Sequence, residues 1–144
     1  MITIGIASDH AGFELKEFVK SYIEHKGFDC KDFGAHSTES CDYSDYAHPL
    51  AKAVESGDVE RGIALCGSGN GIAMTLNKHQ GIRAAICWNV SLVQMACAHN
   101  NANILVLPAR YISRKEAEEI VDFFFKTPFE GGRHKTRIEK IPIK

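Results

Sequence analysis

The chain has 144 residues, 44% of them apolar, which is enough to bury the core of one ordinary domain. Its 17 Lys and Arg residues nearly balance its 18 Asp and Glu residues, and this gives the whole molecule no attraction for nucleic acid or an anionic membrane. No apolar run approaches the ~18 residues of a membrane-spanning helix, and no basic leader with a cleavage pattern precedes the first apolar run. Five cysteines without a CxxC pair are typical of reduced thiols. We therefore expect one soluble, cytoplasmic domain over residues 1–144.

Apolar, β-branched runs alternate with amphipathic segments along most of the chain. Strands are predicted at 3–7, 29–33, 61–66, 84–87 and 104–108. Helices are predicted at 13–26, 46–56, 90–99 and 113–126, and a further helix follows the glycine turn after the third strand and ends near residue 78. In the last helix, Ser113 and Glu116 have the spacing of a capping box, and Ile120, Val121, Phe124 and Phe125 form an apolar stripe that should be core. The alternation predicts an α/β fold, a Rossmann-like three-layer αβα sandwich with a five-stranded parallel sheet.

The segment 129–144 reads FEGGRHKTRIEKIPIK and differs from the rest of the chain. Gly131 and Gly132 break the preceding helix, and a basic amphipathic piece follows. Arg133 and Arg137 are four residues apart, so their planar donors share a helical face and suit a phosphate, although a solvated face is the commoner use of such a pair. Because no strand remains for this segment to join, we expect a C-terminal helical tail that packs on a partner subunit.

Polar residues follow several of the predicted strands. In open parallel sheets a ligand lies beyond the carboxyl ends of the strands. The segments to inspect are therefore Ser8-Asp9-His10, the turn from Cys66 to Gly71, His99-Asn100-Asn101 after the fourth helix, and Pro108-Ala109-Arg110. We expect all four segments to face one crevice.

The turn from Gly67 to Gly71 is the strongest local signal. Alternating glycines after a strand allow backbone N–H groups to converge at a helix N-terminus, where the helix dipole favours an anion. The turn is not a Walker A loop, because no Gly-Lys-Ser/Thr follows, and it also lacks the spacing of a dinucleotide-binding turn. An oxyanion-binding nest is the functional interpretation. Tight turning and close helix packing are the structural alternative.

Three side-chain types near these segments can move protons. Cys66 lies beside the nest, where the positive end of a helix dipole favours a thiolate that serves as base or nucleophile; the alternative is a buried structural cysteine. Asp9 with His10, and His99 at a helix end, supply acids and imidazoles for a proton shuttle. A surface or helix-capping role is the commoner explanation for any single histidine.

The chain resembles the ribose-5-phosphate isomerase B family, whose relatives include galactose-6-phosphate and allose-6-phosphate isomerases. The resemblance covers essentially the whole chain. It rests on the ordered motifs ASDHAGFELK, DYSDYAHPLA, GIALCGSGNGIAMTLNK, GIRAAIC, AHNNANILVLPAR and FEGGRHKTRIEKI.

The resemblance implies a role for each matching position. Cys66 would be the base that moves a proton between C1 and C2, and His99 the acid that opens the sugar ring, with Asp9 and Ser68 assisting. Gly67, Ser68, Gly69, Asn70 and Gly71 would form the nest that holds the enediolate. His10, Arg133 and Arg137 would bind the phosphate, and Tyr43, Asn100 and Arg110 would contact the sugar.

The resemblance also implies a reaction and an assembly. The reaction would interconvert ribose 5-phosphate and ribulose 5-phosphate without metal or cofactor, in a homodimer or dimer of dimers whose subunits share their active sites. Two departures bear on this expectation. Ser68 replaces a common threonine, which keeps the hydroxyl but affects sugar preference. Ser44 replaces a common proline, which should loosen the loop that presents Tyr43.

Three alternatives remain at this point. The first is a preference for allose 6-phosphate or galactose 6-phosphate. The second is a non-catalytic module that binds sugar phosphates. The third is a zinc-dependent hydrolase or lyase, since Cys66, His99, His10 and Asp9 are acceptable zinc ligands, but no HExxH or paired-cysteine spacing supports it.

Overall fold

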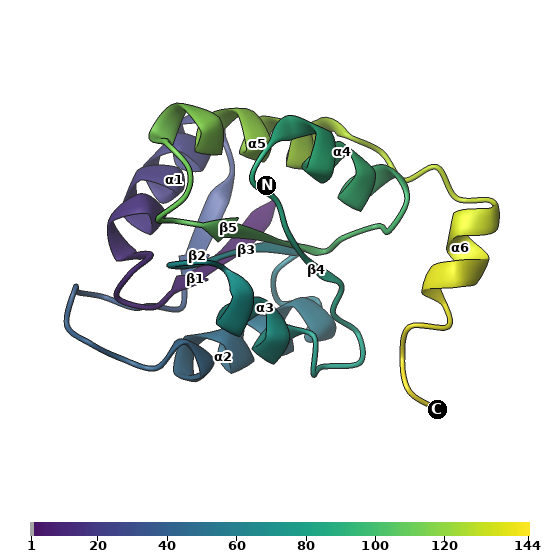
Figure 1. Cartoon of the computed structure of the whole chain (residues 1–144), viewed down its shortest axis with the longest axis horizontal. Helices are drawn as coiled ribbons and strands as arrows, with labels where there is room; N and C mark the ends of the chain where they lie inside the picture. Colours follow the sequence, from purple (N-terminus) through teal and green to yellow (C-terminus); the bar gives the residue numbers. More distant parts are fainter. Residues whose placement is uncertain (1) are drawn as a thin grey trace.

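A computed structural model describes residues 2–144 and shows a five-stranded parallel sheet with helices on both faces (Figure 1). The strands, in spatial order, are β2 (Asp29–Asp32), β1 (Thr3–Ser8), β3 (Arg61–Cys66), β5 (Ile104–Pro108) and β4 (Ala84–Ile86). The helices are α1 (Phe13–His25), α2 (Tyr43–Ser56), α3 (Asn70–Leu76), α4 (Val90–Ala98), α5 (Arg114–Lys126) and α6 (Arg133–Ile138). The predicted α/β sandwich with a C-terminal helix is confirmed.

Two apolar clusters hold the helices to the sheet. Helices α1, α4 and α5 cover one face, and α2 and α3 cover the other (Figure 1). Neighbouring residues of the central strands alternate between the clusters: Ile63 and Leu65 face α1 and α5, whereas Ala64 and Cys66 face α2 and α3. Because both faces are covered, the central strands contain continuous apolar runs over residues 4–7, 62–66 and 104–108, as expected for a parallel sheet.

Helix α5 forms as the sequence predicts. The Ser113 hydroxyl accepts a hydrogen bond from the Glu116 N–H (3.1 Å), and the Glu116 carboxylate accepts one from the Ser113 N–H (2.8 Å). Ile120, Val121 and Phe124 are fully buried, as the predicted stripe requires. Phe125, also in that stripe, is half-buried and stacks on Phe28 with 4.3 Å between the ring centroids.

Helix α2 begins at Tyr43, three residues before the predicted start at 46. The prediction was wrong because the first buried residue, Ala47, lies in the second turn, and the polar first turn shows no apolar periodicity. Asp42 is the N-cap, and Pro49 lies well inside the helix. Ser44 therefore lies in the first turn of a helix, so the expectation that it loosens a loop is also wrong.

The carboxyl ends of the three central strands meet at one edge of the sheet. Ser8 pairs in register with Leu65, and Cys66 pairs with Pro108. The chain leaves β1 toward β2 on one side, while β3 lies on the other side of β1. This reversal is the topological switch point at which α/β sheets bind ligands.

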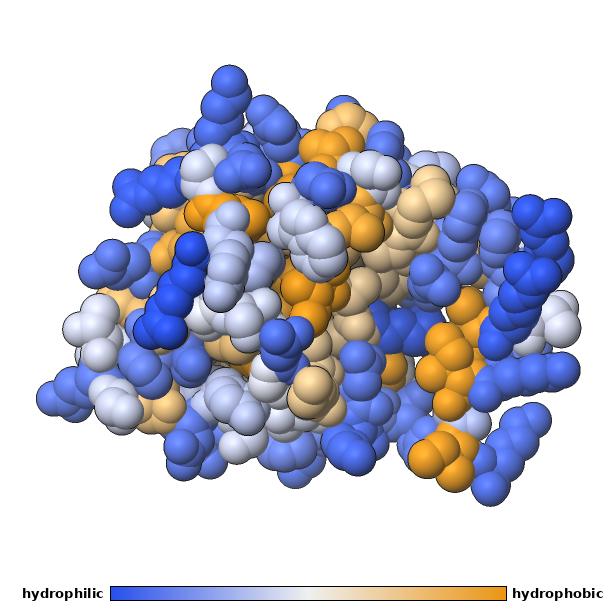
Figure 2. All heavy atoms as spheres, in the orientation of Figure 1, coloured by the Kyte–Doolittle hydropathy of each residue, from blue (hydrophilic) through white to orange (hydrophobic). Residues whose placement is uncertain are grey.

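The tail contacts the rest of the chain through a few hydrogen bonds and through the stacking of His134 on His99. Gly131 and Gly132 have φ angles of 72° and 57° and directly precede α6. Helix α5 already ends at Lys126, so the prediction that these glycines break that helix is wrong. Helix α6 buries none of its residues and stands beside the sheet (Figure 1). Figure 2 shows apolar side chains exposed on the tail, where Ile141 and Ile143 are exposed. No helix within residues 2–144 is long and apolar enough to cross a membrane.

A buried ion pair joins α1 to β2. The Lys16 ammonium is fully buried and donates to an Asp32 carboxylate oxygen at 2.7 Å; the other oxygen accepts the Gly34 N–H at 2.9 Å. Burial raises the pKa of Asp32, but the hydrogen bonds from Lys16 and Gly34 outweigh that effect, and the net pKa is lowered. Ionised Asp32 therefore stabilises the folded state.

We expect Asp32→Asn to lower the free energy of unfolding by about 3 kcal/mol at neutral pH, because Lys16 would keep a buried charge without this carboxylate. The stabilisation by Asp32 is fully present above its ordinary pKa of 3.8 and is lost as pH falls through the lowered, folded pKa. The difference between the two proteins should therefore shrink in acid. Urea unfolding from about pH 7 to about pH 3 measures it.

The matched control is Asp58→Asn, which removes an exposed pair with Lys31 (2.6 Å) and should cost less than about 1 kcal/mol. Equal losses in the two variants at neutral pH would contradict the assigned role of the Lys16–Asp32 pair.

Candidate active site

A cavity of about 380 Å³ opens at the switch point. Residues that follow β1, β3 and β5, together with the start of α2, line it. Eight predicted site residues lie there: Asp9, His10, Tyr43, Cys66, Gly67, Ser68, Gly71 and Arg110. The sequence prediction of a shared crevice is thus confirmed for the segments after β1, β3 and β5.

Cys66 is the last residue of β3 and is 4% exposed. Its carbonyl accepts the Ala109 N–H at 2.9 Å, so the neighbouring strand holds its backbone in place. Burial raises the pKa of Cys30 and of Cys87 to about 12, so those two side chains stay thiols at neutral pH. Cys66 is the cysteine that combines a place in this cavity with a position beside the glycine turn.

The glycine turn presents unpaired backbone donors. Gly69 has a φ of 81° and is the N-cap of α3. Within residues 2–144, the N–H groups of Gly67, Ser68, Gly69 and Gly71 donate to no other group, whereas the Asn70 N–H donates to the Ser68 hydroxyl (3.2 Å). These free N–H groups suit an oxyanion that develops next to Cys66.

Two glycines of this turn allow the side chains of Tyr43 and Arg110 to lie directly against its backbone. A Cβ atom at Gly71 would lie 2.4 Å from Cζ of Tyr43, so the tyrosine ring can occupy its position only over a glycine. A Cβ atom at Gly67 would lie 3.1 Å from Nη1 of Arg110, and the Arg110 N–H also donates to the Gly67 carbonyl (3.0 Å). The turn therefore positions Tyr43 and Arg110 as well as its own donors.

Asp9 and His10 are oriented by backbone groups. The buried Asp9 carboxylate accepts the Gly12 N–H at 3.1 Å. Nδ1 of His10 accepts the Cys41 N–H at 3.2 Å, so a neutral His10 ring carries its proton on Nε2, where it can donate to an anion. Cys41 also lines the cavity, with Sγ 3.9 Å from Nδ1 of His10. Cys41 was given no role from the sequence; its place just before the Asp42-Tyr43 motif was the available signal.

The other predicted residues lie elsewhere in the chain. His99 caps the C-terminus of α4, Asn100 follows it, and Arg133 and Arg137 belong to α6. Asn100 lines a separate cavity with Arg83 and Ala84, at the start of β4. The expectation that His99 and Asn100 share one crevice with Cys66 is wrong for a single chain. Each connecting helix runs back across the sheet, so its C-terminus lies at the edge where the strands begin.

Gly69 and Asn70, the other two residues of the predicted nest, do not line the cavity that contains Cys66. Gly69 packs against Val106 and Ile86. A Cβ atom added at Gly69 would lie 3.1 Å from Cγ1 of Val106 and 3.3 Å from Cγ2 of Ile86. Asn70 lines a neighbouring cavity of about 430 Å³ with Ser68, Ile86, Trp88, Pro108 and Tyr111. Trp88 is 53% exposed and Tyr111 is 75% exposed. Ser68 therefore borders both cavities.

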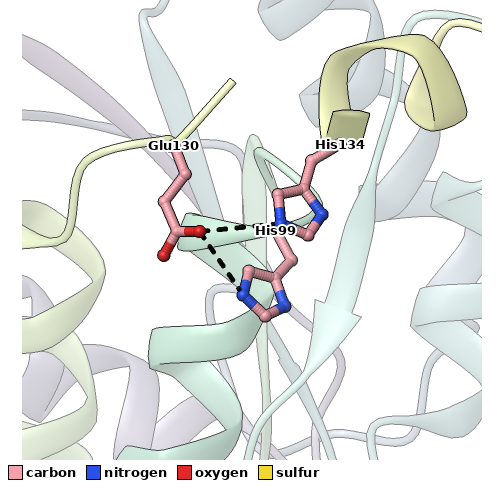
Figure 3. Close-up of side chains that lie close together, drawn as sticks. All are labelled: His99, Glu130 and His134. Atoms are coloured by element: carbon pink, nitrogen blue, oxygen red, sulfur yellow. Dashed lines mark ion pairs between the residues drawn. The ribbon is translucent and has the colours of Figure 1, made fainter. Parts of the chain in front are cut away.

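Around His99, a second cluster of ionisable groups forms (Figure 3). The rings of His99 and His134 stack with 4.2 Å between centroids, and Oε1 of Glu130 lies 3.7 Å from Nε2 of His99 and 3.6 Å from Nε2 of His134. Desolvation, with His99 and Arg133, lowers the pKa of His134 against the opposing effect of Glu130. The sequence alone marked neither Glu130 nor His134, because only folding brings α6 next to α4.

The chain is similar to known proteins over nearly its full length. Residues 4–141 match the family described as Ribose/Galactose Isomerase. A ribose 5-phosphate isomerase structure from Thermotoga maritima is 50% identical, with a TM-score of 0.96, and covers 98% of this chain and 97% of its own. Ribose-5-phosphate isomerase B of Escherichia coli is 38% identical over 98% of this chain and 95% of its own length. The structure of ribose-5-phosphate isomerase B from Mycoplasma genitalium, with bound ribulose-5-phosphate, is 39% identical with a TM-score of 0.92, and the match covers 97% of this chain and 93% of that one.

Proposed function

The chain belongs to the ribose/galactose isomerase family and is a sugar-phosphate isomerase, and we propose that it interconverts ribose 5-phosphate and ribulose 5-phosphate. The observation that carries the proposal is the cavity in which Cys66 lies beside the free N–H groups of the glycine turn. Two of the related proteins support this choice of sugar by their names, and a third does so by its bound ribulose-5-phosphate.

The cavity offers what an aldose-ketose isomerisation needs. A base must take the proton from C2 of the open-chain aldose and return it to C1, and the negative charge that develops on the carbonyl oxygen must be stabilised. In the proposal, the Cys66 thiolate moves the proton and the N–H groups of Gly67 to Gly71 bind the oxygen of a cis-enediolate. No step calls for a metal or cofactor.

Ring opening and phosphate binding involve both ends of the chain. The acid proposed to open the furanose is His99, assisted by Asp9 and Ser68. Arg133 and Arg137 are proposed to bind the phosphate with Nε2 of His10, and Asn100 with Tyr43 and Arg110 to contact the sugar. The C-terminus of α4 lies at the edge of the sheet opposite to Cys66, and α6 stands beside the sheet (Figure 1), so we propose that these roles are filled from a second copy of the chain.

We therefore propose a homodimer, alone or as a dimer of dimers, in which His99, Asn100, Arg133 and Arg137 of one copy complete the cavity of the other. The exposed Trp88 and Tyr111 beside that cavity, and Ile141 and Ile143 on the tail, supply apolar surface for such a contact. Helix α6, none of whose residues is fully buried within its own chain, would then pack against the partner, as expected from the sequence.

Initial rates on ribose 5-phosphate, allose 6-phosphate and galactose 6-phosphate, each with and without a chelator, test the substrate and the metal requirement. We expect the highest kcat/KM for ribose 5-phosphate, with no loss after chelation. A higher value for a six-carbon sugar would overturn the substrate choice. Failure to turn over any sugar phosphate would favour the binding module, and loss of activity with chelator would favour a metal enzyme.

A further inference from the structure

The cluster at the end of α4 joins three potential metal ligands from three segments (Figure 3). Imidazole and carboxylate groups of His99, Glu130 and His134 each offer one ligand atom, and these atoms all lie within 4.8 Å of one another. We propose that they form a binding site for a single divalent transition-metal ion such as Zn²⁺, and that metal binding there inhibits the isomerase. The inhibitory part rests on the proposed function, because it depends on His99 as the acid.

The spacing of these atoms suits one ion. A tetrahedral zinc ion with bonds of about 2.1 Å separates its ligand atoms by about 3.4 Å. Nε2 of His99 and Nε2 of His134 lie 3.7 and 3.6 Å from the same Glu130 oxygen, within about a few tenths of an ångström of that spacing. The two rings are stacked with an angle of 9° between their planes, so one ring must turn about its χ2 bond before both nitrogen lone pairs point at one ion. Two imidazoles and one carboxylate are a zinc-binding set that leaves the fourth position open.

The backbone holds the ligands in this arrangement. The Glu130 N–H donates to the carbonyl of Ala98 at 3.0 Å, which ties Glu130 to the residue before His99. The His134 N–H donates to the Gly131 carbonyl at 3.1 Å, and His134 follows Glu130 by four residues across the turn formed by Gly131 and Gly132. These bonds fix the backbone positions of the ligands, and the turn of one imidazole ring is the rearrangement that metal binding requires.

The charges near the cluster identify its essential ligand. Arg133 and Arg137 lie on the same short helix as His134, and their positive charges oppose a bound cation. Glu130 supplies the negative charge of the cluster. A substitution that removes this charge but keeps the side-chain shape should therefore weaken metal binding strongly, because it removes both a ligand and the charge that offsets the two arginines.

Metal binding would compete with proton transfer. An imidazole nitrogen that coordinates an ion uses the lone pair with which it would accept a proton, and it carries no proton to donate. With Nε2 of His99 bound to metal, the ring-opening acid would be lost. The isomerase would then work without metal and be inhibited by it, so a chelator would preserve or raise its activity.

Calorimetric titration of the metal-free protein with Zn²⁺ tests the site directly. We expect one ion per chain in the wild type and at least about a hundredfold weaker binding in Glu130→Gln and in His134→Asn. The matched controls are Glu139→Gln, at the end of α6, and His25→Asn, at the end of α1, both outside the cluster. Wild-type affinity in both cluster variants would overturn the site.

Cobalt identifies the donor atoms. Co²⁺ in place of Zn²⁺ should give the visible bands of a four-coordinate ion without an intense thiolate charge-transfer band. A strong thiolate band in the wild type would assign the binding to cysteines and overturn the proposal.

Inhibition is measured separately, with each variant compared with its own metal-free rate on ribose 5-phosphate. Zn²⁺ should inhibit the wild type reversibly, and His134→Asn should need about a hundredfold more. Binding without inhibition would overturn the regulatory role alone. No turnover of any sugar phosphate would remove the proposed function and the inhibitory role together, while the titration would still decide whether the metal site exists.

Discussion

Replacing Cys66 with alanine should lower kcat for ribose 5-phosphate by about 10²- to 10⁴-fold, the usual contribution of a positioned general base, with a much smaller change in KM. The thiol ends a buried strand beside the free N–H groups of the glycine turn. Alanine removes the sulfur and keeps the backbone that carries this turn. Steady-state kinetics of the wild type and the variant, in both directions of the reaction, measure the effect.

Two matched cysteine variants isolate the effect of Cys66. Cys41→Ala removes the other thiol that lines the same cavity, and Cys30→Ala removes a thiol on β2 whose pKa burial raises to about 12. Both variants should retain most of the wild-type kcat. Full activity in Cys66→Ala would contradict the assigned base, and a large loss in Cys41→Ala would move that role to Cys41.

Mixing two inactive variants should restore activity. Cys66→Ala and His99→Asn are each expected to be inactive alone. Co-expressed in equal amounts, they should recover about one quarter of the wild-type rate, because half of the pairs are mixed and each mixed pair has one complete site. This is expected because Cys66 and His99 are separated within each chain. Cys66 lies where the strands end, and His99 lies at the C-terminus of α4.

The control is the double variant Cys66→Ala/His99→Asn, co-expressed with each single variant. Neither mixture can form a complete site, so neither should recover activity. Failure of the two single variants to complement each other, in a preparation shown to contain mixed pairs, would contradict the shared site and leave both residues acting within one chain.

Local sequence patterns predicted the elements with strong periodicity or strong capping. The Ser113 capping box and the apolar stripe of α5 are examples, because each depends on residues within one or two helical turns. The start of α2 was misjudged because its first turn is polar and its N-cap makes no side-chain hydrogen bond. The available signal was Asp42, a residue type favoured at helix N-caps, with the acidic Asp45 in the first turn.

The candidate site divides in the same way. The polar residues after β1, β3 and β5 were assigned to one cavity correctly, since parallel strands bring their carboxyl ends to a common edge. His99 and Asn100 were assigned wrongly to the cavity of their own chain, because they follow a helix that runs back across the sheet. The error came from treating a helix end as a strand end.

By itself, the sequence determined the α/β fold, the order of its elements and the residues of the glycine turn, because these follow from period, turn chemistry and chain direction. Only the tertiary structure decided which of those residues meet. It brought Gly71 under Tyr43, Cys41 against His10, and Glu130 between His99 and His134. Contacts between segments far apart in the chain depend on how helices pack on the sheet, and no local pattern encodes that packing.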